Sequence, residues 1–494
     1  MAHALDYRRS VSHLDWFGAT RTNAARIRQG AGISGADMAL ILVFLIGLYT
    51  HYTIMISAKV PFPSVPSGIA GLTLLWRRRQ QISEKAFIGY LFILFLYLVS
   101  ILVAPNVSFL SRRLNGLVQL VYSLTIGYAL FLTVVQARRT QIAGLFLAIA
   151  LVIVIGCLLE DYTGLRDISD HVRQAIYQRG VYENDLRDMV LYHRVRPKFF
   201  ASEPASVTFC FSLFTFVWFV VSRWRWKLVL YVALVALGLF AMPGPTLLLM
   251  LVLILPYLLF LASRHNGRLS FLRLFKVAIV AVFFLVAFVV VGLSVFHNRI
   301  EQVAAGNDPS FFYRVQGPAI AAREILRDYP ITGAGLTGEP FIEARVTNIY
   351  VQSPAYSTAW QIVSPATELL INYFWLHWIY LGLFFGIVIT AALTTWLFAL
   401  GIPSAAFCWM AWAILGQASG AYVGPTCWAV MFLCGGAAVL HQRAALEPAR
   451  LRYARLPDLR VRLEGIISPL RKRPPGRRAR RPERREPPWK PAAH

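Results

Sequence analysis

Charged residues are scarce in this chain of 494 amino acids, and acidic residues are the scarcest of them. Only 15% of the residues are Asp, Glu, Lys or Arg, whereas 57% are hydrophobic, and 49 Lys and Arg outnumber 24 Asp and Glu. Soluble domains carry about 25% charged residues. The composition therefore excludes an ordinary soluble enzyme and is typical of a protein that crosses a membrane many times.

Metal-binding patterns are also missing from the sequence. The five cysteines all fall within apolar segments without a CxxC pair, and no HExxH motif occurs. We therefore expect no metal and no other cofactor, and we interpret the cysteines as small residues of membrane helices. The GxGxxG match at residues 333–338 follows a helical pattern instead of a strand, so it predicts a turn and not a nucleotide site.

Long apolar runs, in contrast, fill most of the chain. Most of them approach the roughly 20 residues that a helix needs to cross a bilayer. They predict an all-α polytopic membrane protein with about twelve transmembrane helices, over residues 36–57, 64–76, 86–104, 114–136, 141–159, 203–222, 228–242, 245–263, 277–296, 367–400, 402–418 and 421–440. We expect no cleavable signal peptide, because residues 1–35 are polar and basic.

Lys and Arg are unevenly divided between the segments that connect these runs. If the N-terminus is cytoplasmic, the segments on its side hold 34 of the 49 basic residues, while the opposite side holds 15 basic and 15 acidic residues. Because basic loops stay in the cytoplasm, both termini are predicted to be cytoplasmic. The predicted parts are a basic N-terminal segment (1–35), a polytopic membrane domain (36–440) and a C-terminal tail (441–494).

The C-terminal tail is rich in proline and carries 16 basic and 5 acidic residues. Such a segment cannot bury a hydrophobic core, so we expect it to be disordered. A basic tail beside a membrane helix favours anionic lipid over nucleic acid as its partner. Whether it also binds a chain-length regulator is left open.

Two predicted outer loops are much longer than ordinary connections, and both lie on the non-cytoplasmic side. They span residues 160–202 and 297–366. Long loops of this kind usually carry function, so we place the candidate site on this face.

The first outer loop ends in an arginine-rich stretch where the next apolar run begins. Glu203 and Pro204 predict a helix start. Glu203 is interpreted either as an acid at a helix N-terminus or as a catalytic carboxylate at the membrane boundary. Arg194 and Arg196 suit a diphosphate or, alternatively, lipid headgroups.

The second outer loop contains a pattern that predicts an amphipathic helix beginning near Pro318. Arg314 precedes this helix, and Arg323 and Arg327, four residues apart, share its polar face. The helix suits a lipid-linked phosphate above a membrane cavity or, alternatively, a position on the bilayer surface.

Three stretches resemble one known family. They are "RPKFFASEPASVTFCFSLF", "DPSFFYRVQGPAIAAREILRDYPITGAGLTGE" and "NIYVQ" followed by "ELLINYFWLHWIYLGLFFGIV". Over residues 114–440 the chain is similar to the O-antigen ligase-like and Wzy-type polysaccharide polymerase superfamily. The resemblance implies a GT-C-like glycosyltransferase of the bacterial inner membrane, whose loop 297–366 covers an extracytoplasmic cavity. It also implies a metal-independent transfer of glycan from an undecaprenyl-diphosphate-linked donor to an acceptor glycan.

The resemblance further implies roles for individual residues. Arg196 and Arg314 would bind the diphosphate leaving group, and Glu203 would orient or deprotonate the acceptor hydroxyl. The further substrate-binding candidates are Arg194, Arg323, Arg327 and Asn348. Family members often carry Ser-Arg where this chain reads "MPGPTLLLM" without a charge. Thr347 precedes Asn348 where ligases usually have His, which favours a polymerase.

Three functions are therefore weighed from the sequence. The first is polymerisation of undecaprenyl-diphosphate-linked repeat units into O-antigen or exopolysaccharide. The second is a ligase that transfers glycan to an acceptor such as lipid A core. The third is a lipid or glycan transporter (flippase) without bond chemistry. The predicted spans carry no charged residue in their interior, with Asp37, Glu203 and Glu368 only at their ends, which argues against proton-coupled transport and leaves a lipid flippase open.

Overall fold

The computed structural model describes the greater part of the predicted membrane domain. The described residues are 32–57, 60–177, 182, 185–262, 264, 265, 268, 269, 271–295, 301, 303, 305, 308, 311–353, 365–418 and 420–443. All of them belong to one unit, Met1–Ala444. The expectations for the N-terminal segment before residue 32 and for the tail after residue 443 lie outside the described residues.

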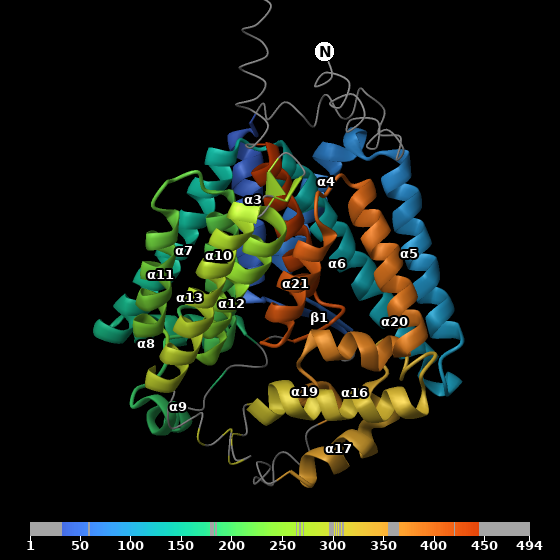
Figure 1. The fold of residues 1–494 in the computed structure, drawn as a ribbon. Helices are drawn as coiled ribbons and strands as arrows, with labels where there is room; N and C mark the ends of the chain where they lie inside the picture. Colours follow the sequence, from blue (N-terminus) through green and yellow to red (C-terminus); the bar gives the residue numbers. More distant parts are fainter. Residues whose placement is uncertain are drawn as a thin grey trace, which may run out of the picture. The chain divides into compact units, whose positions relative to one another are not determined.

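Helices make up almost all of the described chain (Figure 1). Their bounds are α3 Gly35–Thr50, α4 Val65–Arg78, α5 Glu84–Leu102, α6 Leu110–Gln136, α7 Arg139–Tyr162, α8 Leu165–Ile176, α9 Asp185–Tyr192, α10 Pro204–Val221, α11 Lys227–Ala241, α12 Leu248–Tyr257, α13 Phe271–Val295, α16 Gly317–Asp328, α17 Glu343–Val351, α19 Ala366–Leu369, α20 Tyr373–Ala399, α21 Ala405–Gly416 and a helix over residues 425–443.

Short turns of 3₁₀ or π geometry adjoin several of these helices. They are η1 Arg79–Gln81, η2 Val107–Phe109, η3 Pro245–Leu247, η4 Leu258–Ala262, η5 Phe312–Gln316 and η6 Glu339–Ile342. The strands of the described residues form two small antiparallel hairpins. β1 (Ile54–Ser57) pairs with β2 (Val60–Phe62), and β3 (Arg264–His265) pairs with β4 (Arg268–Leu269).

Each predicted apolar run coincides with a helix, and the all-helical membrane class is confirmed at this level. Among the described helices, seven are long and apolar enough to cross a membrane: Glu84–Leu102, Val107–Gln136, Arg139–Tyr162, Pro204–Val221, Pro245–Ala262, Val277–Ser294 and Tyr373–Ala399. Three further apolar helices are shorter. The number of twelve crossings stays a prediction.

Two predicted spans differ from the structure at their ends. The run 36–57 was expected to be one helix, but α3 ends at Thr50, and His51 caps it in the left-handed region at φ 52°. Its last residues instead form the β1–β2 hairpin, where Pro61 and Pro63 prevent a helix. The run 367–400 is also divided, because Asn372 caps a new helix, accepting the N–H groups of Phe374 and Trp375.

Helix α10 is the centre of the bundle. It is apolar all round, and nearly every one of its residues is buried, as expected of a helix that neighbours surround on all sides. It packs against α3, α7, α11 and α12, with Phe214 edge-on to Phe146 of α7 at 5.7 Å. The position of its first residue is therefore fixed by several helices.

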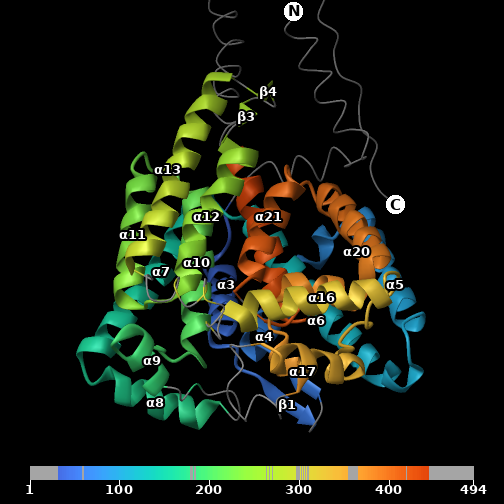
Figure 2. The ribbon, with the colours of Figure 1, turned by 60° about the horizontal axis from the view of Figure 1, so that its bottom comes forward.

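The basic connections meet at one end of this bundle. The Arg78 guanidinium donates to Gln136, Arg139 donates to the Ser222 carbonyl at 3.1 Å, and Arg443 donates to the Val135 carbonyl. These contacts join segments that the charge distribution assigns to the cytoplasmic side. At the opposite end lie α8, α9, α16 and α17, which come from the two long outer loops (Figures 1 and 2).

The second outer loop fills a break in α20. At Gly382 (φ 67°) the helix is interrupted, and the Leu383 N–H donates to the Pro330 carbonyl at 2.6 Å. Gly333 (φ 58°) lies so close that a Cβ built on it would be 2.6 Å from the Gly382 nitrogen. The glycine-rich motif is thus the tight turn that the sequence predicted, and it supplies partners for backbone groups that the break frees.

The predicted orientation can be tested with single cysteines at exposed positions, since all five native cysteines are buried. We expect a membrane-impermeant maleimide to label Arg323→Cys in right-side-out spheroplasts, and to label Arg225→Cys only after the membrane is permeabilised. Both side chains are exposed, so unequal labelling reports sidedness. Labelling of Arg225→Cys in sealed spheroplasts would reverse the orientation.

Candidate functional site

Residues 198–203, just before α10, form a strained turn. Phe199 (φ 36°) and Phe200 (φ 63°) both adopt left-handed backbone conformations, which are rare for bulky side chains. Each such residue costs roughly 1–3 kcal/mol and persists only where its surroundings hold it in place. The turn is therefore held by contacts from outside itself.

Two buried side chains accept the N–H groups of this turn. The Glu160 carboxylate, at the end of α7, accepts the N–H of Lys198 at 2.9 Å and that of Phe199. The Ser169 hydroxyl of α8 accepts the Phe200 N–H at 3.0 Å. Glu160 is 1% exposed. Charge-assisted hydrogen bonds of this kind are among the stronger ones in proteins.

Three more side chains donate to the carbonyl groups of the turn. The Tyr49 hydroxyl donates to the Phe199 carbonyl at 2.8 Å. The Tyr177 hydroxyl lies 2.9 Å from the Phe200 carbonyl and 2.7 Å from the Thr50 carbonyl, so its one proton is shared between them. Burial raises the pKa of Tyr177 to about 12, so its hydroxyl keeps the donated proton. The Arg173 guanidinium donates to the carbonyls of the next two residues at 2.8 and 3.0 Å.

Glu203 follows this clamped turn and begins α10, as predicted. It is the N-cap residue and Pro204 is the first helical residue, yet the Glu203 carboxylate makes no capping hydrogen bond. The carboxylate is half-buried and has no hydrogen-bonding or ion-pair partner in the part of the chain that the structure describes. A simple capping role does not account for it.

His51, at the end of α3, is the ionisable neighbour of Glu203. Burial lowers the pKa of the His51 imidazole below its ordinary value, although the negative charge of Glu203 acts in the opposite direction. The imidazole is therefore neutral at pH 7, and its Nε2 lies 3.1 Å from the Thr426 hydroxyl. A neutral His51 is not a counter-ion for Glu203, and none of the other described residues forms an ion pair with it.

Arg196 is held in an ion pair within the first outer loop. Its Nε and Nη2 both lie 2.9 Å from Oδ1 of the buried Asp188, and the Tyr192 ring lies 4.9 Å from the guanidinium. Burial alone would lower the pKa of this guanidinium, but Tyr192, Asp188 and Tyr182 raise it above its ordinary value. Arg196 thus has protein partners for part of its donor set.

Tyr182 connects Arg196 with the turn before Glu203. Its hydroxyl donates to Asp188 at 2.8 Å and accepts from Arg196 at 3.2 Å, while its backbone N–H donates to the Ser202 carbonyl at 3.1 Å. The structure therefore brings Arg196 and the Glu203 end of the turn to the same residue, Tyr182.

Arg194 is tied to the membrane helices instead. Its guanidinium lies 3.3 Å from the Asp161 carboxylate and donates to the Phe240 carbonyl at the end of α11. Arg166 pairs with the same Asp161 at 2.9 Å. Arg194 therefore fastens the outer loop to α7 and α11.

Arg314 lies in a second group of residues, beside the end of α21. Its Nη1 donates to the Ala418 carbonyl at 2.8 Å, and its own carbonyl accepts from Asn372 at 2.7 Å. The connection from Ala418 to Thr426 thus contacts Arg314 at one end and His51 at the other. The residues around Arg314 and those around Glu203 and His51 therefore lie at the same end of the bundle.

The remaining candidates are on the surface of the second outer loop. The polar face of α16 exposes Arg323 and Arg327, whereas Ala322 and Ile325 are buried and the helix packs against α20. The amphipathic helix near Pro318 is confirmed. Neither arginine has an ion-pair partner among the described residues, and Asn348 of α17 is exposed as well.

The acidic residues that organise the turn were not singled out from the sequence. Glu160 and Asp161 end an apolar helix, where two adjacent carboxylates are unexpected, and Asp188 lies eight residues before Arg196. Acidic residues at such positions were the feature of the sequence that could have identified them as partners of the turn and its arginines. Among the described residues, no group of three His, Cys, Asp or Glu is arranged to hold a metal ion.

Comparison with models of protein families, with curated proteins and with solved structures finds no match for this chain.

Replacing Glu160 should release the strained turn. In Glu160→Gln, the amide NH₂ faces one of the two buried N–H groups, and an unsatisfied buried donor costs about 1–3 kcal/mol. We expect a lower melting temperature in detergent, measured by fluorescence-detected size exclusion after heating. Asp167→Asn, an exposed change in α8, is the matched control, and equal melting of the two variants would contradict this role of Glu160.

Proposed function

We propose that this protein is a membrane glycosyltransferase that polymerises oligosaccharide repeat units carried on undecaprenyl diphosphate at the outer face of the bacterial inner membrane. The observation that carries the proposal is the Glu203 carboxylate, which has no hydrogen-bonding or ion-pair partner among the described residues and which a strained turn holds at the start of the central helix. Strain of this kind is concentrated at functional sites. The resemblance of residues 196–214 and 308–339 to the polymerase superfamily supports the same reaction.

In the proposed step, Glu203 is the general base. The acceptor hydroxyl oxygen forms a bond to the anomeric carbon of the donor while the bond from that carbon to the phosphate oxygen breaks. The hydroxyl proton passes to Glu203, and the electron pair leaves with undecaprenyl diphosphate. None of the described residues forms an ion pair with Glu203, which suits this role, because a tight ion pair would make the carboxylate a weaker base.

Arginines on the second outer loop are suited to the donor's diphosphate. Arg323 and Arg327 are exposed on one face of α16, and a pair of guanidinium groups matches phosphate oxygens in geometry and charge. With Arg314 they would neutralise the charge that grows on the leaving group. Asn348 is an exposed candidate for contact with a sugar.

Arg196 and Arg194 take a different part in this proposal. Carboxylates already engage both guanidinium groups. Arg196 therefore mainly positions the turn that carries Glu203, through Tyr182, and Arg194 mainly attaches the first outer loop to α7 and α11. Arg196 also keeps an Nη1 that bonds to none of the described residues, and this nitrogen remains suited to a phosphate oxygen.

We prefer the polymerase to the ligase because of a residue linked to the choice of acceptor. Both reactions would use the same donor and the same base, so the site itself is common to them. Thr347 stands before Asn348 where the ligases to which the chain is similar usually carry histidine. The acceptor of this proposal is therefore a second lipid-linked repeat unit.

The proposal is tested first with Glu203→Gln in a strain that lacks the native chain. We expect exported single repeat units and a loss of long glycan of at least about 100-fold, because a general base contributes about 10²–10⁴ in rate. The measurement is the profile of lipid-linked and surface glycans. Glu343→Gln, an exposed change in the first turn of α17, should retain normal polymer.

Each other glycan profile would contradict one part of the proposal. Normal polymer in the Glu203 variant would remove Glu203 from the mechanism. Complete polymer left on its lipid carrier in the deletion strain would indicate a ligase. Repeat units retained on the cytoplasmic leaflet of that strain would indicate a transporter.

Variants of Arg196 distinguish a role in positioning the turn from a role in binding the substrate. Arg196→Ala leaves the buried Asp188 carboxylate unpaired, which is expected to cost about 3–5 kcal/mol and to lower the melting temperature as well as polymer yield. Arg196→Lys retains the charge, so the fold should largely recover and polymer should return in part. A fully stable Arg196→Ala protein that makes no polymer would contradict the positioning role and would indicate direct contact with the donor.

A further inference from the structure

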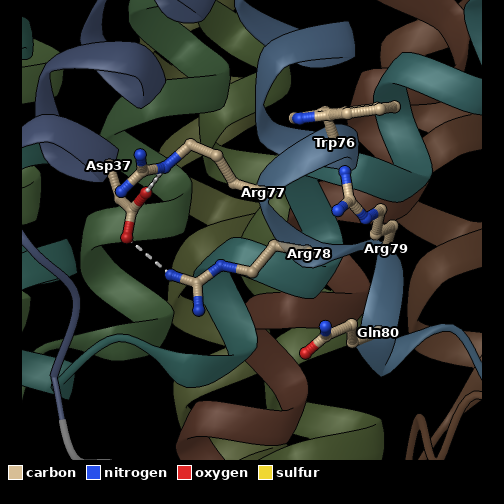
Figure 3. Close-up of a pocket in the computed structure, with 6 residues that line it drawn as sticks. All are labelled: Asp37, Trp76, Arg77, Arg78, Arg79 and Gln80. Carbon is tan, nitrogen blue, oxygen red and sulfur yellow. Dashed lines mark hydrogen bonds and ion pairs between the residues drawn. The ribbon is translucent and has the colours of Figure 1, made fainter.

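An open cavity, whose lining residues are drawn in Figure 3, lies beside the end of α4. It has a volume of about 480 Å³ and is lined by residues from α3, α4 and η1: Asp37, Trp76, Arg77, Arg78, Arg79 and Gln80. Asp37 is in the first turn of α3, and His51 is at its other end. Sixteen helical residues rise about 24 Å, so the cavity is separate from the candidate active site.

The lining of this cavity is positively charged. The Asp37 carboxylate accepts from Arg77 at 2.7 Å and from Arg78 at 2.6 Å. Three guanidinium groups and one carboxylate leave two net positive charges. The buried Nε of Arg78 also has no hydrogen-bond partner among the described residues. The cavity is therefore short of negative charge and of acceptors.

Among these three arginines, Arg79 has the guanidinium that is available to bind a ligand. It forms no hydrogen bond or ion pair with the residues that the structure describes, and it stacks on the Trp76 ring at 4.0 Å. Stacking uses the face of a guanidinium and leaves its in-plane N–H donors available. Those donors match phosphate oxygens.

An apolar stripe leads along α4 to the cavity. Ile69, Leu72 and Trp76 are 63%, 48% and 70% exposed and share one helix face. The opposite face packs against α3 and α6. In a bilayer the exposed stripe contacts lipid chains, and an indole at the end of such a stripe lies at headgroup depth.

We propose that this cavity binds the phosphate of an anionic phospholipid headgroup, with the acyl chains of the lipid lying along the Ile69–Trp76 stripe. The net positive charge selects an anionic ligand, and the adjoining apolar face selects one with hydrocarbon chains. The site is independent of the proposed glycosyl transfer, since it involves none of the residues of that reaction.

The proposal is tested by titrating the purified full-length protein with palmitoyl-oleoyl phosphatidylglycerol in neutral mixed micelles and counting the retained lipids by native mass spectrometry. A basic residue at a charged lipid surface contributes about 1 kcal/mol. We therefore expect Arg79→Ala to bind the lipid about fivefold more weakly. Arg225→Ala is the matched control, because Arg225 is also exposed beside a tryptophan, with its guanidinium 5.5 Å from the Trp226 ring.

Three outcomes distinguish the possible ligands. Weaker binding in Arg79→Ala alone, with no competition from millimolar inorganic phosphate, supports a lipid site. Equal weakening in Arg225→Ala would mean general attraction to a basic surface and would overturn the proposal. Displacement of the lipid by inorganic phosphate would assign the cavity to a soluble anion and would overturn the lipid assignment.

Discussion

The Glu160 carboxylate is the contact on which the outer end of the bundle depends. A turn with two phenylalanines in left-handed conformations is unfavourable by itself, and its N–H groups lie where water is scarce. One buried carboxylate accepts two of them at once and ties the turn to the end of α7. Because α10 starts immediately after this turn and is packed on all sides, the direction of its first residues follows from that attachment.

At both ends of the bundle, side chains satisfy backbone groups that lack a partner within their own segment, and the side chains at the two ends differ in charge. At the outer end, Glu160 and Ser169 accept N–H groups of a turn. At the basic end, Arg139 donates to the Val221 carbonyl and Lys227 donates to the Phe219 carbonyl at 3.0 Å, both in the last turn of α10. Cations are favoured at helix C-termini. Two of the basic residues that predict orientation thus also satisfy backbone carbonyls at the C-terminal end of α10.

The sequence predicted the parts of the fold that depend on local pattern. Apolar length located the helices, Glu203 and Pro204 located the start of α10, and the spacing of Arg323 and Arg327 identified the polar face of α16. Such features repeat within a few residues, so they can be read without the fold.

The parts that depend on contact between distant segments were not predictable. The ion pair of Arg196 with Asp188 requires the first outer loop to fold back on itself. The neutral His51 beside Glu203 requires α3 to end early at a turn, where a longer helix was expected. Neither feature could be identified from the sequence, because the burial of a side chain and the identity of its contact partner depend on how distant segments pack in the folded bundle.

The close approach of Gly333 and Gly382 has a consequence for the engineering of this chain. A Cβ on either glycine would meet backbone of the other segment, so the glycine-rich turn and the interruption of α20 are one structural unit in two pieces of sequence. A graft of the second outer loop onto a different membrane scaffold would need the broken helix as well. A transplanted segment of this loop would therefore have to end before Pro330 if the broken helix is left behind.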